Sequence, residues 1–140
     1  MNPAGKHILI IDNDPTSRRL FGSLLGIAGY EVLYAEDGRV GREVARRLHP
    51  DLILLDINMS GESGFKTAVN IHKEADSPAS DIPMVFLSNA DLPIEEQKWM
   101  SGSGVIDYIQ KGVTNDEFVA RVNGIFEKLE KKVEVEMAKQ

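Results

Sequence analysis

The sequence predicts an α/β fold in which helices cover both faces of a parallel sheet. Apolar runs of about 5–6 residues alternate with stretches of helical spacing, which is the pattern of repeated βαβ units. The run from Ile8 to Ile11 is apolar at every position, as in strands that are buried on both faces. At 140 residues, with 42% hydrophobic content, the chain is expected to form one compact domain.

Strands and helices are expected to alternate along the whole chain. The strands are expected near residues 7–11, 31–35, 51–55, 82–88 and 105–109, and the helices near 15–28, 38–48, 63–75, 93–101 and from 114 onward. Asp14 and Pro15 provide a cap and a first-turn proline for the first helix, and Gly29 ends it. Pro93 opens the fourth helix, and Asn115 lies in the first turn of the fifth.

The last predicted helix is longer than the fold requires. Its core-facing stripe is expected at Phe118, Val122, Ile125 and Leu129, and Val133 and Met137 continue the same spacing. We therefore expect a domain over residues 6–128, with residues 129–140 as an extension of the fifth helix or a linker. A frayed helix end and a helical connector or short coiled coil both fit this segment, because about two heptads are too few to decide.

Composition excludes several classes of protein. The chain has no cysteine, which rules out disulfides and thiolate metal sites. No signal peptide and no apolar stretch long enough to span a bilayer is visible, so a soluble cytoplasmic protein is expected, with no membrane partner. The net charge of −6 argues against nucleic-acid binding by this domain, which usually needs a basic face.

Polar groups follow four of the predicted strands. Asp12 follows the first strand, Asp56 the third, Ser88 the fourth and Lys111 the fifth. With right-handed crossovers these ends share one edge of the sheet, where ligands bind at the switch in strand order. Carboxylates, a hydroxyl and an ammonium at one edge indicate a site for phosphate chemistry.

The expected chemistry is transfer of a phosphoryl group to a carboxylate. Two carboxylates about 5 Å apart repel by roughly 3 kcal/mol at an effective dielectric of about 20, so a dication is needed. Mg²⁺ suits a small open cluster because it keeps several waters and takes only one or two carboxylates. Lys111 would supply a charge for a phosphate oxygen and Ser88 a hydroxyl donor. No strong base for water is evident, so an acyl phosphate should persist long enough to signal.

Four motifs in this order resemble the receiver domain of two-component response regulators, over roughly residues 6–128. They are IIDND at the first strand end, PDLILLDINMSGESG around Asp56, IPMVFLSNA around Ser88 and DYIQKG around Lys111. The resemblance implies a flavodoxin-like, doubly wound sheet of five parallel strands in the order 2-1-3-4-5, with five helices. It also implies a signalling domain rather than an enzyme, phosphorylated by a histidine kinase or a phosphotransfer protein.

The same resemblance assigns roles to individual residues. Asp56 would be the phosphoacceptor. Ser88 would be the switch hydroxyl, Tyr108 the rotating aromatic and Lys111 the ammonium that contacts phosphate. The Mg²⁺ ligands would be Asp12, Asn13, Asp56 and the backbone carbonyl of Asn58.

Four positions depart from the family pattern. Asn13 stands where a second carboxylate is usual, so metal affinity should fall, and Asn89 stands where a small residue is usual. Ser60 and Gly112 stand where proline is common. Without proline a cis bond costs about 2.5–4 kcal/mol, so a trans bond is expected before Gly112.

Three alternatives remain open. A pseudo-receiver would bind partners without being phosphorylated. A haloacid-dehalogenase-type phosphatase would use Asp12 as nucleophile and Asp14 as general acid, although the helix beginning at Pro15 leaves no room for a cap. An electron-transfer protein of flavodoxin type would need a phosphate loop that the chain lacks.

The output surface is expected at the fourth helix, the fifth strand and the fifth helix. The fourth helix is short and is followed by the glycine-containing stretch 101–104. A phosphate on Asp56 would draw Ser88 inward and let Tyr108 follow, and Trp99 on that helix should report the change. This face would bind an output domain or partner protein, or form a weak homodimer.

Overall fold

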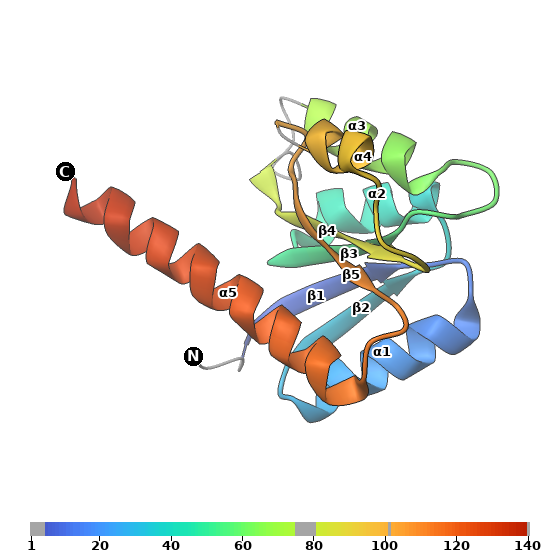
Figure 1. Cartoon of the computed structure of the whole chain (residues 1–140), viewed down its shortest axis with the longest axis horizontal. Coiled ribbons are helices and arrows are strands. Elements are labelled where there is room, and N and C mark those ends of the chain that lie inside the picture. Colours follow the sequence, from blue (N-terminus) through green and yellow to red (C-terminus); the bar gives the residue numbers. More distant parts are fainter. Residues whose placement is uncertain (1–4, 75–80, 101, 140) are drawn as a thin grey trace.

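The computed structural model describes residues 5–74, 81–100 and 102–139, and it shows a five-stranded parallel sheet between layers of helices (Figure 1). The strands are β1 His7–Ile11, β2 Glu31–Ala35, β3 Leu52–Asp56, β4 Met84–Ser88 and β5 Val105–Gln110. The helices are α1 Pro15–Ile27, α2 Gly38–Leu48, α3 Gly64–Lys73, α4 Ile94–Trp99 and α5 Asn115–Ala138. The strand order is β2-β1-β3-β4-β5 with every pair parallel, which confirms the predicted fold.

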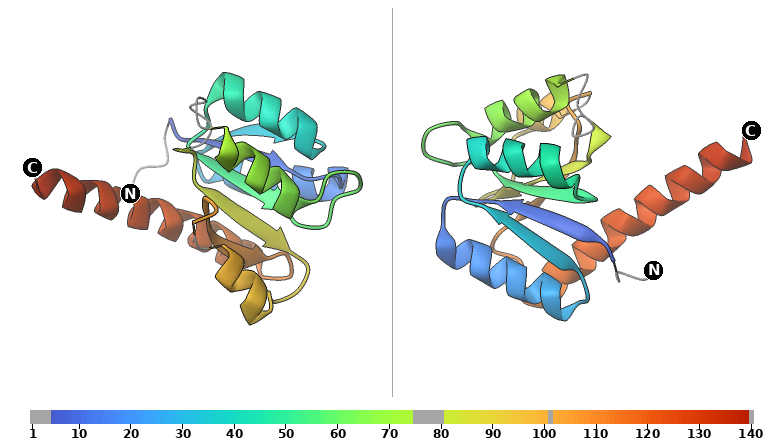
Figure 2. Two further views of the ribbon diagram at one scale, coloured as in Figure 1. Left: turned by 90° about the horizontal axis from the view of Figure 1, so that it is seen from above. Right: turned by 180° about the vertical axis from the view of Figure 1, so that it is seen from behind.

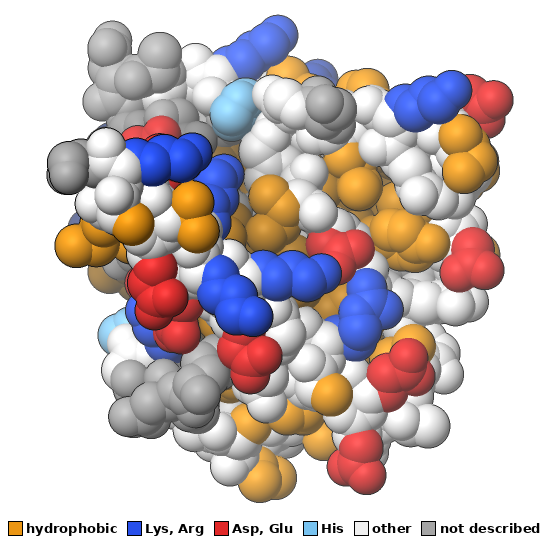
Figure 3. Space-filling view, turned by 60° about the vertical axis from the view of Figure 1, so that its left-hand side comes forward, with side chains coloured by type: hydrophobic (Ala, Val, Ile, Leu, Met, Phe, Trp, Pro, Cys, Tyr) orange, Lys and Arg blue, Asp and Glu red, His pale blue; other side chains and the backbone are white. Residues whose placement is uncertain are grey.

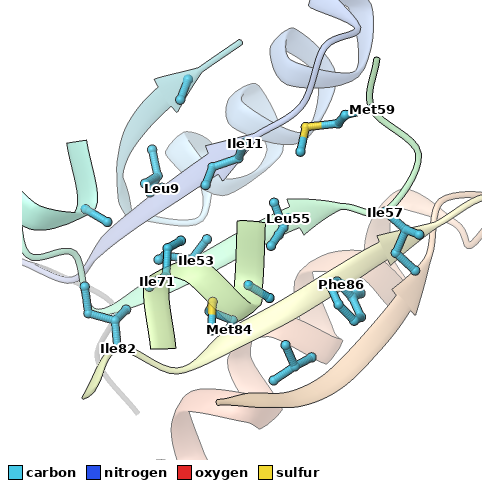
Figure 4. Close-up of a cluster of buried hydrophobic side chains, with 14 of the residues drawn as sticks. Leu9, Ile11, Ile53, Leu55, Ile57, Met59, Ile71, Ile82, Met84 and Phe86 are labelled. Atoms are coloured by element: carbon cyan, nitrogen blue, oxygen red, sulfur yellow. The ribbon is translucent and has the colours of Figure 1, made fainter. Parts of the chain in front are cut away.

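Alternation along the central strands divides the core into two layers. Helices α2 and α3 cover one face of the sheet, and α1 and α5 cover the other (Figure 2). On β1, Leu9 and Ile11 pack in the α2/α3 layer, whereas Ile8 and Ile10 pack against α1 and α5. These four side chains are fully buried, as expected for strands covered on both faces. The α2/α3 layer continues past the end of β3, where Ile57 joins it (Figure 4).

Most helices begin at a side-chain cap. Asp14 accepts a hydrogen bond from the Thr16 amide at 2.9 Å, as predicted for the start of α1. Asp37, Ser63 and Thr114 cap α2, α3 and α5 in the same manner. The α4 helix has no side-chain cap and buries no residue, so packing and capping support it least.

The element boundaries differ from prediction around β4 and β5. β4 begins at Met84 rather than 82, and α4 ends at Trp99. Met84 pairs with Val105 and Val85 with Asp107, so Ile106 forms a bulge and is 48% exposed. The predicted helix ends at 75 and 101 lie outside the described residues.

The α5 helix is the longest element, at 24 residues (Figure 1). Its first half packs on the sheet, and the apolar side chains there are buried: Phe118, Val122, Ile125 and Phe126. Val133 and Met137 are 57% and 66% exposed, and this end of the helix projects beyond the sheet. Among the described residues, no helix has both the length and the apolar character needed to cross a membrane.

Candidate functional site

Lys111 lies between two carboxylates at the carboxyl edge of the sheet. Its Nζ is 2.8 Å from Asp12 Oδ2 and 3.5 Å from Asp56 Oδ1. Asp12 follows β1 and Asp56 ends the neighbouring β3, so the topology brings both carboxylates to one place. The backbone amide of Lys111 donates to the Ser88 carbonyl at 2.7 Å, which anchors the lysine at the end of β4. Four predicted site residues, Asp12, Asp56, Ser88 and Lys111, are therefore gathered at this edge.

The ion cluster is buried and carries excess negative charge. Asp12 is 0% and Asp56 5% exposed. Burial raises the pKa of Asp56 above its usual value, the Lys111 ammonium opposes that rise, and the charge of Asp12 adds to it. One ammonium cannot neutralise two ionised carboxylates, so the site favours the arrival of another cation.

The loop between β1 and α1 holds Asp12 in place. Asp12 Oδ1 accepts a hydrogen bond from the Asp14 amide at 2.9 Å, and the Asp12 carbonyl accepts one from Arg18 Nη1 at 2.6 Å. The Asp14 carboxylate accepts from the Thr16 amide and the Ser17 hydroxyl, and the Thr16 contact lowers the pKa of Asp14. Asp14 is thus held ionised as a helix cap, which does not suit a general acid. Arg18 was not predicted, and its place one turn after an acidic loop is the only sequence signal for it.

The loop between β3 and α3 alternates between core and solvent. Ile57 and Met59 are buried, as the close-up of that layer shows (Figure 4), whereas Asn58 and Ser60 are exposed. The Asn58 amide donates to Asp56 Oδ1 at 3.3 Å. Two apolar anchors therefore fix the loop that carries the predicted carbonyl ligand of Asn58.

Asn13 contacts two neighbouring loops. Its Nδ2 donates to the Glu36 carbonyl at 2.6 Å, and its Oδ1 accepts from the Ser60 amide at 2.6 Å and from the Ser60 hydroxyl at 3.3 Å. The predicted ligand oxygen of Asn13 is therefore already hydrogen-bonded in this structure.

Ser88 and Tyr108 lie on the adjacent strands β4 and β5. The Ser88 hydroxyl donates to the Ala90 carbonyl and accepts from the Ala90 amide at 3.2 Å. Tyr108 is partly buried against the α2/α3 layer, and its carbonyl accepts from Arg121 Nη2 of α5 at 2.7 Å. The hydroxyl is thus satisfied within its own loop and would have to leave Ala90 to reach another oxygen.

An aromatic cluster joins α4 to β4. The Trp99 ring lies 5.1 Å from Phe65 and 6.1 Å from Phe86 between ring centroids. Phe86 and Ser88 face the same side of β4, because side chains two apart on a strand point the same way. Trp99 therefore contacts Phe86, and Phe86 lies two positions before Ser88 on the same side of β4.

A polar network that the sequence did not predict anchors the far end of the β3–α3 loop. Glu62 Oε2 accepts from the Thr67 hydroxyl at 2.7 Å, and Oε1 accepts from Asn70 at 2.8 Å. Arg42 of α2 lies 3.3 Å from Glu62 Oε1. A single glutamate in a glycine-containing loop carries no sequence signal for such a role.

The donor set suits a hard cation that keeps water ligands. Within the described ranges no group of three or more His, Cys, Asp or Glu side chains could hold a metal. Two carboxylates and nearby backbone or amide oxygens do match Mg²⁺, which takes one or two carboxylates and completes its shell with water. The excess negative charge on Asp12 and Asp56 supports that fit.

Comparison with known proteins gives a consistent result. The family model described as "Response regulator receiver domain" matches residues 8–123. The chain is 32% identical to Protein PilH of Pseudomonas aeruginosa over 84% of this chain and 95% of that protein. It is 36% identical to the phosphate regulon transcriptional regulatory protein PhoB of the same species, over 86% of this chain but only 52% of PhoB. The structure of chemotaxis protein CheY4 of Vibrio cholerae superposes with a TM-score of 0.77, covering 86% of this chain and 98% of CheY4 at 23% identity, which supports the fold.

Proposed function

The chain belongs to the response regulator receiver domains, and from that premise we propose that Asp56 accepts a phosphoryl group from a histidine kinase or a phosphotransfer protein. The observation that carries the proposal is the ion cluster: Lys111 Nζ lies 3.5 Å from Asp56 Oδ1 and 2.8 Å from the buried carboxylate of Asp12. Of the two carboxylates, Asp56 retains some exposure and Asp12 has none. Asp56 is therefore the better placed nucleophile.

The proposed step exchanges one bond to phosphorus for another. A carboxylate oxygen of Asp56 forms a bond to phosphorus while the bond from phosphorus to the donor histidine nitrogen breaks. The imidazole keeps that electron pair and takes up a proton, and an acyl phosphate remains on Asp56. Lys111 would shift its ammonium from the Asp56 carboxylate to a phosphate oxygen, where a point charge stabilises the transferred group.

Asp12, Asp56 and the Asn58 carbonyl would hold Mg²⁺, with the Asn13 amide oxygen available if it leaves Ser60. The ion would neutralise charge on the carboxylates and on the phosphoryl oxygens. The domain would catalyse only its own phosphorylation and the hydrolysis of that group.

The proposed output face is formed by α4, β5 and α5. Ser88 would leave Ala90 to donate to the phosphate, and Tyr108 would follow it inward. A ligand shifts such an equilibrium only through a differential contact, and the bond from the Ser88 hydroxyl would be that contact. Large apolar side chains are exposed on this face, with Ile94 60% and Ile106 48% accessible. They suit binding of an output domain or partner protein, or a weak homodimer.

Protein partners are favoured over nucleic acid for this domain. The net charge is −6, and on the face in Figure 3 basic side chains are interspersed with acidic ones. We expect the domain to act in the cytoplasm. The chain spans about half the length of PhoB. Residues 6–128 would be the receiver unit, and residues 129–140 would be an extension of α5 or a linker.

The deciding experiment is phosphorylation with a small acyl-phosphate donor and Mg²⁺, read by intact mass and peptide mapping. We expect one phosphoryl group on Asp56, and none in Asp56→Asn. A label on Asp12 would support the phosphatase reading instead. If neither this donor nor a panel of phosphorylated histidine kinases labels the chain, the pseudo-receiver reading replaces the proposal.

The switch is tested separately with beryllofluoride, which mimics a phosphoryl group on a carboxylate. We expect the fluorescence of Trp99 to change, because it packs on Phe65 and Phe86 beside the strand that carries Ser88. Ser88→Ala should bind beryllofluoride and leave the fluorescence unchanged. An equal change in both proteins would place the switch elsewhere.

A further inference from the structure

Two departures from the family pattern lie in direct contact. Asn13 replaces the usual second acid and Ser60 the common proline, and the two residues are 47 positions apart in the chain. In the structure Asn13 Oδ1 accepts from the Ser60 amide at 2.6 Å and from its hydroxyl at 3.3 Å. The departures are therefore one structural feature rather than two separate changes.

Neither usual residue could make this set of contacts. Proline at position 60 has no amide hydrogen and could not donate to Asn13. Aspartate at position 13 has no side-chain hydrogen to donate to the Glu36 carbonyl, which Asn13 Nδ2 contacts at 2.6 Å. The partners also fix the amide orientation, because the Glu36 carbonyl only accepts and the Ser60 amide only donates. Asparagine is thus the residue that can bridge both.

The bridge joins three loops at the site. Asn13 lies in the β1–α1 loop, Glu36 in the β2–α2 loop and Ser60 in the β3–α3 loop. The third loop also carries Asn58, whose amide contacts Asp56, and its far end is fixed by Glu62. Release of Asn13 would free the middle of this loop at Ser60, between Met59, which is buried in the core, and Glu62, which is held by Thr67.

We propose that Asn13 and Ser60 form a latch that closes the β3–α3 loop beside Asp56, and that Mg²⁺ opens the latch by taking the Asn13 amide oxygen from the Ser60 amide. The inference rests on the proposed function only in taking Mg²⁺ as the cation of this site. The amide oxygen has two lone pairs and already accepts two donors from Ser60, at 2.6 Å and 3.3 Å, so a cation that binds this oxygen competes with Ser60 for it. Metal binding and loop position are then linked through one oxygen atom, and the affinity for Mg²⁺ is lowered by the latch.

Hydrogen exchange of the Ser60 amide in metal-free protein tests the latch directly. Asn13→Ala should speed that exchange by roughly 3- to 10-fold, the range that the net free energy of one hydrogen bond gives. The control is the Glu117 amide, which donates to the Thr114 hydroxyl at the start of α5 and should not change. Saturating Mg²⁺ should speed exchange of the Ser60 amide in the wild-type protein by a similar factor. Exchange that is insensitive to Asn13→Ala refutes the latch, and exchange that Mg²⁺ slows or leaves unchanged refutes the competition.

A matched pair of variants at position 60 tests the effect on metal affinity. Ser60→Ala keeps the amide donor and loses only the longer contact, whereas Ser60→Pro loses both. We expect Ser60→Pro to bind Mg²⁺ roughly 3- to 10-fold more tightly than the wild type, and Ser60→Ala to bind about as the wild type does. Calorimetric titration gives the affinities, and circular dichroism checks that each variant is folded. A folded Ser60→Pro that binds no more tightly would overturn the competition, and an unfolded one leaves the exchange result to decide.

These measurements use no phosphodonor, so they separate this inference from the proposed function. A chain that never accepts a phosphoryl group would still show the exchange and affinity changes. A chain that is phosphorylated on Asp56 without them would retain the proposed function and lose the latch.

Discussion

Lys111→Met removes the ammonium that lies between the two buried carboxylates while keeping most of the side-chain volume. At an effective dielectric of about 20, the 2.8 Å and 3.5 Å separations correspond to gross attractions of about 6 and about 5 kcal/mol. The net loss is smaller because the wild type must also bury the ammonium, whose side chain is only 13% exposed. Breaking a buried ion pair costs about 3–5 kcal/mol, and we expect a loss of unfolding free energy in that range at neutral pH.

The loss should depend on pH. Lys111 lowers the pKa of Asp56, so its removal raises that pKa further above the usual value. A carboxyl group whose pKa is higher in the folded than in the unfolded state favours folding at low pH, and this contribution disappears as pH rises through the folded pKa. The part of the cost of Lys111→Met that comes from Asp56 should therefore be smaller near about pH 4 than near about pH 8.

The assay is urea denaturation followed by the fluorescence of Trp99, in the presence of a chelator. Lys131→Met removes the same charge from an exposed position on α5, and its effect should stay within about 0.5 kcal/mol. Mg²⁺ should stabilise Lys111→Met more than the wild type, because the variant keeps both carboxylates without the ammonium. A cost for Lys111→Met below about 1 kcal/mol, or an equal cost in acid and at neutral pH, would refute the view that this ion cluster is held by charge.

Three further outcomes are expected. Asp56→Asn should raise the unfolding free energy at neutral pH by on the order of 1–2 kcal/mol, because one of two crowded carboxylates loses its charge. This gain in unfolding free energy should disappear in acid, and urea denaturation at several pH values measures it. Gly64→Ala should destabilise the fold by about 1–3 kcal/mol, because its Cβ would lie 2.3 Å from the Asp56 carbonyl oxygen. Gly124→Ala on α5 has open space around it and should stabilise the fold by about 1 kcal/mol. Equal effects of the two variants in thermal melts would contradict this packing. Burial, with two glutamates of α5, raises the pKa of Tyr30 to about 12, so ultraviolet titration of Tyr30→Phe should lack the most alkaline tyrosine step.

The sequence was sufficient for the fold because the relevant signals are local. The uninterrupted apolar run of β1 and the cap and proline at Asp14 and Pro15 each act within a few residues, and the structure agrees with them. The bulge at Ile106 was not predictable in this way, since β5 can be read as a regular strand until its partner β4 fixes the register.

In the site, too, some features could be predicted from the sequence and others could not. That Asp12, Asp56, Ser88 and Lys111 lie at one edge follows from the βαβ pattern, because the carboxyl ends of parallel strands share one edge of the sheet. The order of the strands was predicted from the resemblance to receiver domains. The contact between Asn13 and Ser60 could not be predicted in this way, because it depends on the path of two loops and on the orientation of the Asn13 side-chain amide. The sequence showed both residues to be unusual and gave no reason to connect them.

The free end of α5 has a mechanical consequence. All residues from 130 to 139 are exposed, and at about 1.5 Å per residue the helix extends roughly 14 Å beyond Leu129. A tilt of about 10° where α5 leaves the sheet would carry its tip through roughly 2 Å. A helical segment this short with no packing partner is only marginally stable in water. The projecting turns of α5 would therefore be stiff enough to transmit that motion only when a partner binds their C-terminal end. How much of a tilt of α5 reaches its C-terminal end would then depend on whether a partner binds and holds that end.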